Sequence, residues 1–168
     1  MSFAVWLTGL SGSGKSAIAR ELARELHERS VDVAVLESDV LRTQLTPYAR
    51  YEDADRDFFY AALVELGAFV AGAGRSVLFD ATANRRRYRD AARGRIGHFC
   101  EVYVDTPLEV CKQRDPKRLY RTGGNMPGVN APYEAPLAPE VVIHGERSTP
   151  RESAERILAH LGTRGWLP

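Results

Sequence analysis

Residues 9–16, GLSGSGKS, have the residue types and the spacing of a loop that binds phosphate. Glycines allow successive backbone N–H groups to converge on one anion, and the start of a following helix adds partial positive charge. Lys15 would neutralise the β and γ phosphates, and the Ser16 hydroxyl would hold Mg²⁺. A glycine-rich turn that only joins a strand to a helix has no use for lysine and serine at these positions. The segment therefore predicts a site for a nucleoside triphosphate. The residues expected to contact it are Gly9, Leu10, Ser11, Gly12, Ser13, Gly14, Lys15 and Ser16.

Other motifs narrow the use of that triphosphate. GTPases read guanine with an Asn-Lys-x-Asp motif, which this sequence lacks, and motor ATPases are usually larger than 168 residues. A small kinase remains. It needs a hydroxyl acceptor, a group that orients or deprotonates the hydroxyl, and cations that spread the charge of the transferring phosphoryl group. A nucleotide-binding regulatory module without catalysis is the alternative from a different class.

Asp80 ends the apolar stretch SVLF, a position where many phosphate-loop enzymes have a carboxylate that holds Mg²⁺ through water. Capping of a loop or helix is the competing interpretation. An arginine-rich run, NRRRYRDAARGR, follows, and Arg85, Arg89 and Arg93 share one helical face within it. Such a run is usually solvated surface, and a phosphate or sulfate clamp is the alternative.

A long segment rich in glycine and proline occupies residues 117–139. Inside a compact domain such a segment is usually a functional lid or a disordered stretch. Closure over the triphosphate would exclude water, which competes as an acceptor, and Gly123 and Gly124 would supply the bend. A mobile basic loop without catalytic contacts is the alternative. The basic residues expected to close over the triphosphate are Arg114, Lys117, Arg118 and Arg121.

Five stretches together resemble the adenylylsulfate kinase family: GLSGSGKS, ESDVLR, YEDADR, EVYVDTPLEVCKQRDPKRLY and PYEAP. The resemblance spans nearly the whole chain, and VYVDTPLEVC with RDPK is its most specific part. The family uses MgATP to phosphorylate the ribose 3′-hydroxyl of adenosine 5′-phosphosulfate in sulfate assimilation, which gives 3′-phosphoadenosine 5′-phosphosulfate. The resemblance therefore implies ATP and Mg²⁺ as cofactors and a small nucleotide as the acceptor substrate.

The resemblance also implies roles on the acceptor side. The family has an Asp-x-Asp pair followed three residues later by arginine, and this chain has Glu37, Asp39 and Arg42. We expect Asp39 to act as general base or to orient the hydroxyl and Mg²⁺, with helix capping as the alternative. Arg42 and Arg56 would clamp the acceptor anion. Tyr51 falls where the family has an aromatic residue that stacks on the acceptor adenine, and packing on a neighbouring helix is its alternative.

The chain departs from the family on this same side. Phe58 and Phe59 stand where the family has a Glu-Asn pair, so a hydrogen-bonding asparagine is lost. Ala83 stands where a serine would fall, which makes a phosphoserine intermediate there impossible. The lid is shorter than usual, and Met126 takes the place of a phenylalanine that would sandwich the adenine. A different nucleotide-linked or small phosphorylated acceptor is therefore the alternative. The expected site residues are Lys15 and Asp39 for catalysis, Ser16, Asp39 and Asp80 for the metal, Arg114 for ATP, and Asp39, Arg42, Tyr51, Arg56 and Met126 for the acceptor.

Strand-like and helix-like patterns alternate along the chain and would position these groups. Residues 3–8, 31–36, 76–80, 99–104 and 140–143 predict strands, and apolar residues at helical spacing separate them. TPLE at Thr106 and TPRE at Thr149 each offer a capping threonine for a helix. The alternation predicts an α/β fold of the phosphate-loop kinase type, a three-layer α/β/α sandwich with a five-stranded, mostly parallel sheet. We expect one domain over residues 1–168, with a lid at about residues 115–139.

Composition bounds the remaining partners and the compartment. A net charge of +1 gives no global reason to expect a nucleic-acid partner, and Cys100 and Cys111 suit a reducing interior. No apolar stretch approaches the ~20 residues of a membrane span, and no basic leader precedes the first apolar run. We therefore expect a cytoplasmic protein without membrane or nucleic-acid partners. Members of the family often dimerise, so a homodimer stays open, although the periodicity does not indicate one.

Overall fold

The computed structural model describes residues 1–48, 52–115 and 117–168. A five-stranded sheet with the strand order β2-β3-β1-β4-β5 forms its centre, and every pairing in it is parallel, as the alternating pattern predicts. The strands are β1 Ala4–Thr8, β2 Val33–Glu37, β3 Ser76–Asp80, β4 Phe99–Asp105 and β5 Val141–His144. The helices are α1 Lys15–Glu28, α2 Ser38–Leu45, α3 Asp53–Gly72, α4 Arg86–Arg95, α5 Leu108–Arg114 and α6 Pro150–Thr163.

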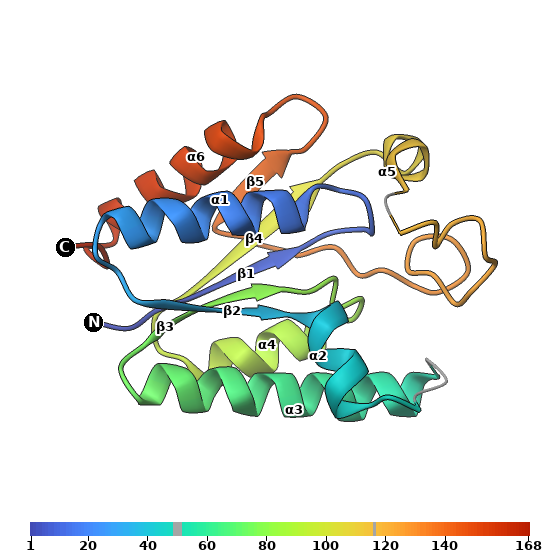
Figure 1. The fold of residues 1–168 in the computed structure, drawn as a ribbon, viewed down its shortest axis with the longest axis horizontal. Helices are drawn as coiled ribbons and strands as arrows, with labels where there is room; N and C mark the ends of the chain where they lie inside the picture. Colours follow the sequence, from blue (N-terminus) through green and yellow to red (C-terminus); the bar gives the residue numbers. More distant parts are fainter. Residues whose placement is uncertain (49–51, 116) are drawn as a thin grey trace.

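Helices cover both faces of the sheet and make three layers (Figure 1). Helices α1 and α6 pack together on one face, and α3 and α4 pack together on the other. The central strand β1 is buried along its whole length and supplies both cores: Leu7 packs with the α1 side, and Trp6 stacks on Phe79 on the α3 side. A parallel strand covered on both faces is apolar throughout, which explains the unbroken AVWLT sequence.

The two predicted threonine caps have different outcomes. Thr149 begins α6 as predicted, because its hydroxyl accepts from the Glu152 N–H at 3.2 Å and the Glu152 carboxylate accepts from the Thr149 N–H at 2.8 Å. The cap predicted at Thr106 is wrong. Helix α5 begins at Leu108 without a side-chain cap, and the Thr106 hydroxyl instead donates to the Ser13 carbonyl oxygen at 2.9 Å.

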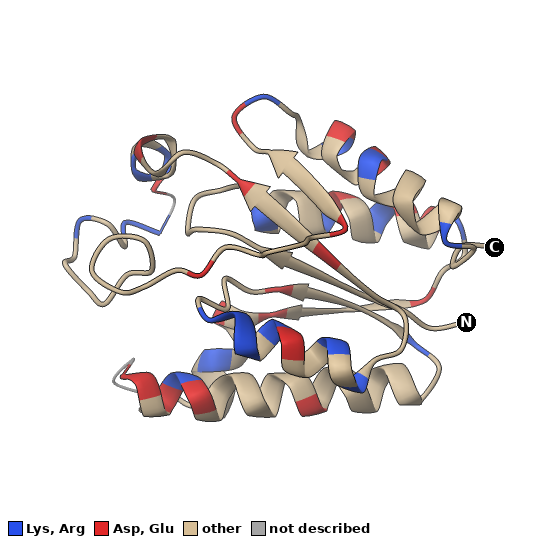
Figure 2. Cartoon of the chain, turned by 180° about the vertical axis from the view of Figure 1, so that it is seen from behind, with Lys and Arg blue, Asp and Glu red and all other residues tan. Residues whose placement is uncertain are grey.

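The carboxyl ends of all five strands meet at one edge of the sheet, because the strands are parallel. Residues 117–139 lie beyond this edge with no regular element except an isolated bridge between Pro127 and Ala131. Figure 1 shows this segment in orange next to α5, at the end of the molecule opposite the two termini. On the α3 and α4 face, basic segments of α4 lie beside acidic segments of α3 (Figure 2). Among the described residues, no helix combines the length and the apolar character needed to cross a membrane.

Candidate active site

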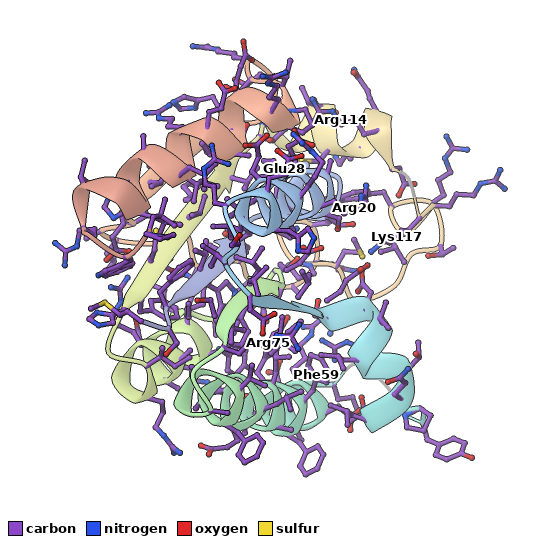
Figure 3. All side chains as sticks on the ribbon, turned by 60° about the vertical axis from the view of Figure 1, so that its left-hand side comes forward. Arg20, Glu28, Phe59, Arg75, Arg114 and Lys117 are labelled. Atoms are coloured by element: carbon purple, nitrogen blue, oxygen red, sulfur yellow. The ribbon has the colours of Figure 1, made fainter. Side chains whose placement is uncertain are left out.

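A cavity of about 1060 Å³ opens at the carboxyl edge of the sheet. This volume lies at the upper end of the usual range for ligand pockets. The loop of residues 9–16, the start of α2, the end of β3 and the predicted lid segment of residues 117–139 all contribute to its wall. Arg20, Arg114 and Lys117 lie on the same side of the molecule in Figure 3. Predicted site residues that line it are Ser11, Gly12, Ser13, Gly14, Lys15, Ser16, Asp39, Arg42, Arg56, Asp80, Arg114 and Met126.

The glycines of the phosphate loop are required by close approach to neighbouring backbone. A Cβ atom on Gly9 would lie 2.5 Å from the Val104 carbonyl oxygen, and one on Gly12 would lie 2.7 Å from the Cys111 carbonyl oxygen. Gly12 also has a φ of 78°, in the left-handed region that favours glycine. The loop therefore lies directly against the end of β4 and against α5. Gly9 and Leu10 do not line the cavity, and their carbonyl oxygens accept hydrogen bonds from Lys15.

Lys15 begins α1, and its side chain turns back over the loop. Its Nζ donates to the carbonyl oxygens of Gly9 at 2.9 Å and of Leu10 at 2.8 Å. The side chain is buried, with 8% exposure, and burial lowers the pKa of Lys15 to about 8, with the nearby Asp80 carboxylate opposing the shift. A buried ammonium at the start of a helix can bind a phosphate anion.

Two carboxylates face this loop from neighbouring strand ends. Asp39 lies in the first turn of α2, where Glu37 is the N-cap residue and makes no side-chain cap, so the capping alternative for Asp39 is wrong. Asp39 instead forms an ion pair with Lys117 of the lid. Asp80 is buried at the end of β3, and it lines the same cavity as Asp39 and Ser16.

The oxygen atoms around the loop suit a hard divalent cation. The Ser16 hydroxyl and the Asp39 and Asp80 carboxylates share the cavity, and Mg²⁺ typically takes one or two protein carboxylates together with water and substrate phosphates. In the described part of the chain, no three His, Cys, Asp or Glu side chains form a ready metal cluster. The donor set therefore fits Mg²⁺ bound together with a triphosphate rather than by the protein alone.

Two buried arginines, Arg42 and Arg56, form part of the cavity wall. The Arg42 guanidinium lies 4.0 Å from the centre of the Phe59 ring, a distance typical of a cation–π contact. Arg56 is 5% exposed; its Nη2 donates to the Asn125 carbonyl oxygen at 2.6 Å, while its Nη1 is buried with no hydrogen-bond partner among the described residues. A buried cationic donor left unmatched is costly, so this wall suits an anionic ligand.

The departures from the family pattern affect this wall unequally. The Phe59 ring packs against the Arg42 guanidinium, whereas Phe58 is 65% exposed and does not line the cavity. Met126 lines the cavity from the lid. Tyr51 lies outside the described residues.

Arg114 braces the backbone on which the triphosphate is expected. Its Nη1 donates to the Ser13 carbonyl oxygen at 3.3 Å, and its Nη2 donates to the Gly145 carbonyl oxygen at 2.9 Å. Tyr120 adds a second link from the lid, because its hydroxyl donates to the Ser11 carbonyl oxygen at 2.7 Å. The segment that carries the lid is therefore attached to the phosphate loop.

Sequence reasoning missed several features of the site. Neither interpretation of the arginine-rich run holds for Arg89, which is neither solvated nor in the cavity and forms a buried ion pair with Glu101 at 2.7 Å. Tyr60, Thr82 and Asn84 also line the cavity, although the sequence did not predict them. Thr82 and Asn84 lie two and four residues after Asp80, so the position of Asp80 at a strand end was the signal that could have found them.

The sequence model of the family described as Adenylylsulphate kinase matches residues 1–144. The chain belongs to the adenylylsulphate kinase family. Its intact phosphate loop, and Asp39 with Arg42 and Arg56 beyond it, all lie within the matched residues. The family match therefore includes every lining residue of the cavity except those that follow β5.

Individual relatives agree with this membership. An adenylyl-sulfate kinase of Gloeothece citriformis is 39% identical over 168 residues, which are 97% of this chain and 96% of that protein. A bifunctional SAT/APS kinase 2 of Sorangium cellulosum is 38% identical over 99% of this chain, and the chain spans 29% of its length. A solved structure of the Mycobacterium tuberculosis APS kinase CysC in complex with AMPPNP and APS has a TM-score of 0.89 and 34% identity, and the match covers 96% of this chain and 98% of that chain.

Proposed function

We propose that the chain transfers the γ-phosphoryl group of MgATP to the 3′-hydroxyl of adenosine 5′-phosphosulfate and forms 3′-phosphoadenosine 5′-phosphosulfate. One observation carries this proposal: a single cavity combines an intact phosphate loop, the carboxylate of Asp39 and two buried arginines, Arg42 and Arg56. A donor triphosphate, a hydroxyl and an acceptor anion each meet a matching group there. Membership of the adenylylsulphate kinase family and the likeness to an APS kinase solved with AMPPNP and APS support the same reaction.

On the donor side, the loop amides and Lys15 bind the β and γ phosphates, and Arg114 holds the loop in shape. Ser16, Asp39 and Asp80 would hold Mg²⁺, which when bound neutralises charge on the phosphate oxygens. Phosphoryl transfer depends mainly on positioning and electrostatic stabilisation, so a rigid loop with a fixed cation is the principal requirement.

On the acceptor side, Asp39 accepts or orients the proton of the attacking hydroxyl, since a carboxylate within reach of both the hydroxyl and the phosphate can serve in either role. Asp39 must first leave Lys117, and Lys117 is then available to the phosphate oxygens. Arg42 and Arg56 bind the phosphosulfate anion through charge-assisted hydrogen bonds. Met126 of the lid and Tyr51 contact the adenine.

Lid closure excludes water from the transferring group. We propose that residues 115–139 form this lid within a single domain. The lid is tied to the body at Tyr120, at Asn125, whose carbonyl oxygen accepts from Arg56, and at Glu134, whose N–H donates to the Asn84 carbonyl oxygen at 2.7 Å. Closure would therefore involve the stretches between these three points.

The test is a coupled assay of ADP formation with purified protein, MgATP and adenosine 5′-phosphosulfate, with identification of the 3′-phosphorylated product. Lys15→Ala is the inactive control. A parallel panel of other nucleotides and small phosphorylated alcohols covers the alternative acceptors that Ala83 and Met126 raise. Protein that is folded and binds ATP but gives no turnover with adenosine 5′-phosphosulfate would refute the proposal, and turnover with another panel member would identify the alternative.

A further inference from the structure

Arg89, in α4, is the least exposed charged residue of the described structure, with 1% exposure. All three of its guanidinium nitrogens donate hydrogen bonds. Nε donates to the Glu101 carboxylate on β4 at 2.7 Å, Nη1 to the Ala83 carbonyl oxygen at 2.5 Å, and Nη2 to the Glu134 carbonyl oxygen at 2.6 Å. One side chain therefore joins the sheet, the loop after β3 and the C-terminal part of the lid.

The loop of residues 82–84 is held in an unusual conformation. Ala83 has a φ of 43°, which an alanine rarely adopts unless the surroundings enforce it. Its carbonyl oxygen accepts from Arg89, and its N–H donates to the Tyr60 hydroxyl oxygen at 2.9 Å. The neighbouring Thr82 carbonyl oxygen accepts from the Thr8 hydroxyl at 2.6 Å. These bonds fix the backbone on both sides of the unfavourable residue.

This conformation matters for the cavity. Thr82 and Asn84 flank Ala83 and both line the cavity, and the ring of Tyr60, which bonds Ala83, has its centre 5.7 Å from the Arg42 guanidinium. A change of the Ala83 backbone would move both side chains. The strained residue thus lies where the acceptor is expected, and strain of this kind is often stored at ligand sites.

Residues 132–134, at the C-terminal end of the lid, are held by the same Arg89 guanidinium and by the loop of residues 82–84. The Glu134 carbonyl oxygen accepts from Arg89, while the Asn84 side chain donates through Nδ2 to the Pro132 carbonyl oxygen at 3.0 Å. The Tyr133 hydroxyl shares a hydrogen bond of 3.0 Å with the Thr8 hydroxyl. Residues 132–134 are consequently attached both to the loop of residues 82–84 and to the end of β1, immediately before the phosphate loop.

We propose that Arg89 is a positioning residue for the acceptor. By holding the Ala83 and Glu134 carbonyl oxygens, it fixes the positions of residues 82–84 and of residues 132–134 relative to the phosphate loop. This inference rests on the proposed function and extends it. Arg89 does not line the cavity, so it acts through these two segments and not by contact with a substrate.

A purely structural role makes a different prediction. Replacement of a buried ion pair by apolar residues of similar size is often neutral or stabilising, whereas loss of one partner leaves an uncompensated charge. Removal of Arg89 and Glu101 together therefore avoids the uncompensated Glu101 charge without restoring the donors to Ala83 and Glu134. Glu101 has a further bond from Arg93 at 3.5 Å, and Arg93 keeps its own partner Glu140 at 2.6 Å.

The experiment compares Arg89→Met, Arg89→Lys, and the double variant Arg89→Met with Glu101→Leu. Arg95→Met, which removes an exposed ion pair with Glu65 from the same helix, is the matched control. Thermal stability, kcat, and the KM values for ATP and for adenosine 5′-phosphosulfate are measured for each. We expect the double variant to be more stable than Arg89→Met, because no uncompensated Glu101 charge remains, while its acceptor KM stays raised on the order of tenfold and its ATP KM stays near the wild-type value.

A double variant that regains both stability and the acceptor KM would overturn the proposal, and so would an equal rise of the two KM values. If Arg89→Met does not fold, Arg89→Lys, which keeps the charge but lacks the fork of donors, carries the test with the same expected split. Hydrogen exchange at the Glu134 amide adds a readout independent of turnover, and we expect faster exchange in the double variant. If the wild-type protein does not phosphorylate adenosine 5′-phosphosulfate, the proposed function fails by itself, and unchanged exchange at Glu134 is then the result that overturns the role of Arg89.

Discussion

The ammonium group of Lys117 in the lid is paired with the carboxylate of Asp39 at the start of α2, 78 residues away in the sequence. Both side chains are about half exposed, and an exposed ion pair contributes at most about 1 kcal/mol. Substrate binding can therefore separate the two groups at small cost. The pair also keeps the acid expected to face the acceptor at the mouth of the cavity, next to the phosphate loop.

Asp39→Asn is expected to lower kcat by roughly 10²–10⁴-fold, the usual contribution of a positioned proton acceptor, while ATP affinity stays nearly unchanged. Single-turnover transfer and a separate ATP binding measurement check the two parts. Asp32→Asn, which alters an exposed ion pair with Arg75 far from the cavity, is the control. A variant at Asp39 with wild-type kcat would remove this residue from the mechanism.

Lys15→Ala is expected to abolish turnover without lowering the melting temperature at pH 7. The pKa of Lys15 is about 8 in the folded chain against 10.5 in the reference state, so the unfolded chain binds the proton more tightly. Below pH 8 the folded state bears the full cost of the buried charge, and this cost is relieved as the pH rises from 8 to 10.5. Scanning calorimetry of wild type and variant checks the stability, and residual activity near the wild-type level contradicts the assigned role.

The same lowered pKa predicts that ATP affinity depends on pH. Phosphate binding needs protonated Lys15, and at pH 9 only about a tenth of a group with a pKa of about 8 carries the proton. The Kd for ATP should therefore rise about tenfold between pH 7 and pH 9. Titration calorimetry measures it directly. In Lys15→Arg, whose charge does not titrate in this range, the rise should disappear, and its persistence there would assign it to another group.

Arg56→Ala is expected to raise the KM for adenosine 5′-phosphosulfate by roughly tenfold to a hundredfold, because a hydrogen bond to a charged group contributes about 1.5–3 kcal/mol. Arg42→Ala should act in the same direction. The ATP KM should change little in both variants. Arg87→Ala, which removes an exposed partner of Asp57, is the matched control. A larger effect on ATP than on the acceptor would show that the two arginines serve the donor side.

Thr149→Ala is expected to lower the free energy of unfolding by about 1 kcal/mol, because it removes the side-chain half of the capping box of α6. Urea denaturation measures the change. Thr163→Ala is a suitable control, since its exposed hydroxyl bonds only the His160 carbonyl oxygen at the other end of the helix. An equal loss in the two variants would mean that the cap contributes nothing specific.

Local patterns predicted the features of this protein that depend on neighbouring residues. The strands and the Thr149 cap each rest on residues a few positions apart, and both are confirmed, while the loop of residues 9–14 joins β1 to α1 as its pattern predicts. The predicted sheet is also confirmed, because helices between strands leave little choice except parallel pairing.

Features that depend on distant partners could not be predicted in this way. The Thr106 hydroxyl bonds Ser13, 93 residues away, and this contact displaces the expected cap. Arg89 donates to the Glu134 carbonyl oxygen, 45 residues further along the chain, so one arginine of the basic run is buried and joins three segments. Nothing within the run distinguishes Arg89 from its exposed neighbours, because the distinction comes from how the lid folds back over the sheet.

Helix α6 sets a lower limit on the length of chain that can fold. The family match ends at residue 144, yet Ile157 and Leu161 lie beyond it and complete the core on the α1 side of the sheet. Gly145, which also lies beyond it, supplies the carbonyl oxygen that anchors Arg114 beside the phosphate loop. A protein truncated after residue 144 would therefore expose an apolar sheet face and loosen the nucleotide site at the same time, so truncation there would cost both solubility and ligand affinity.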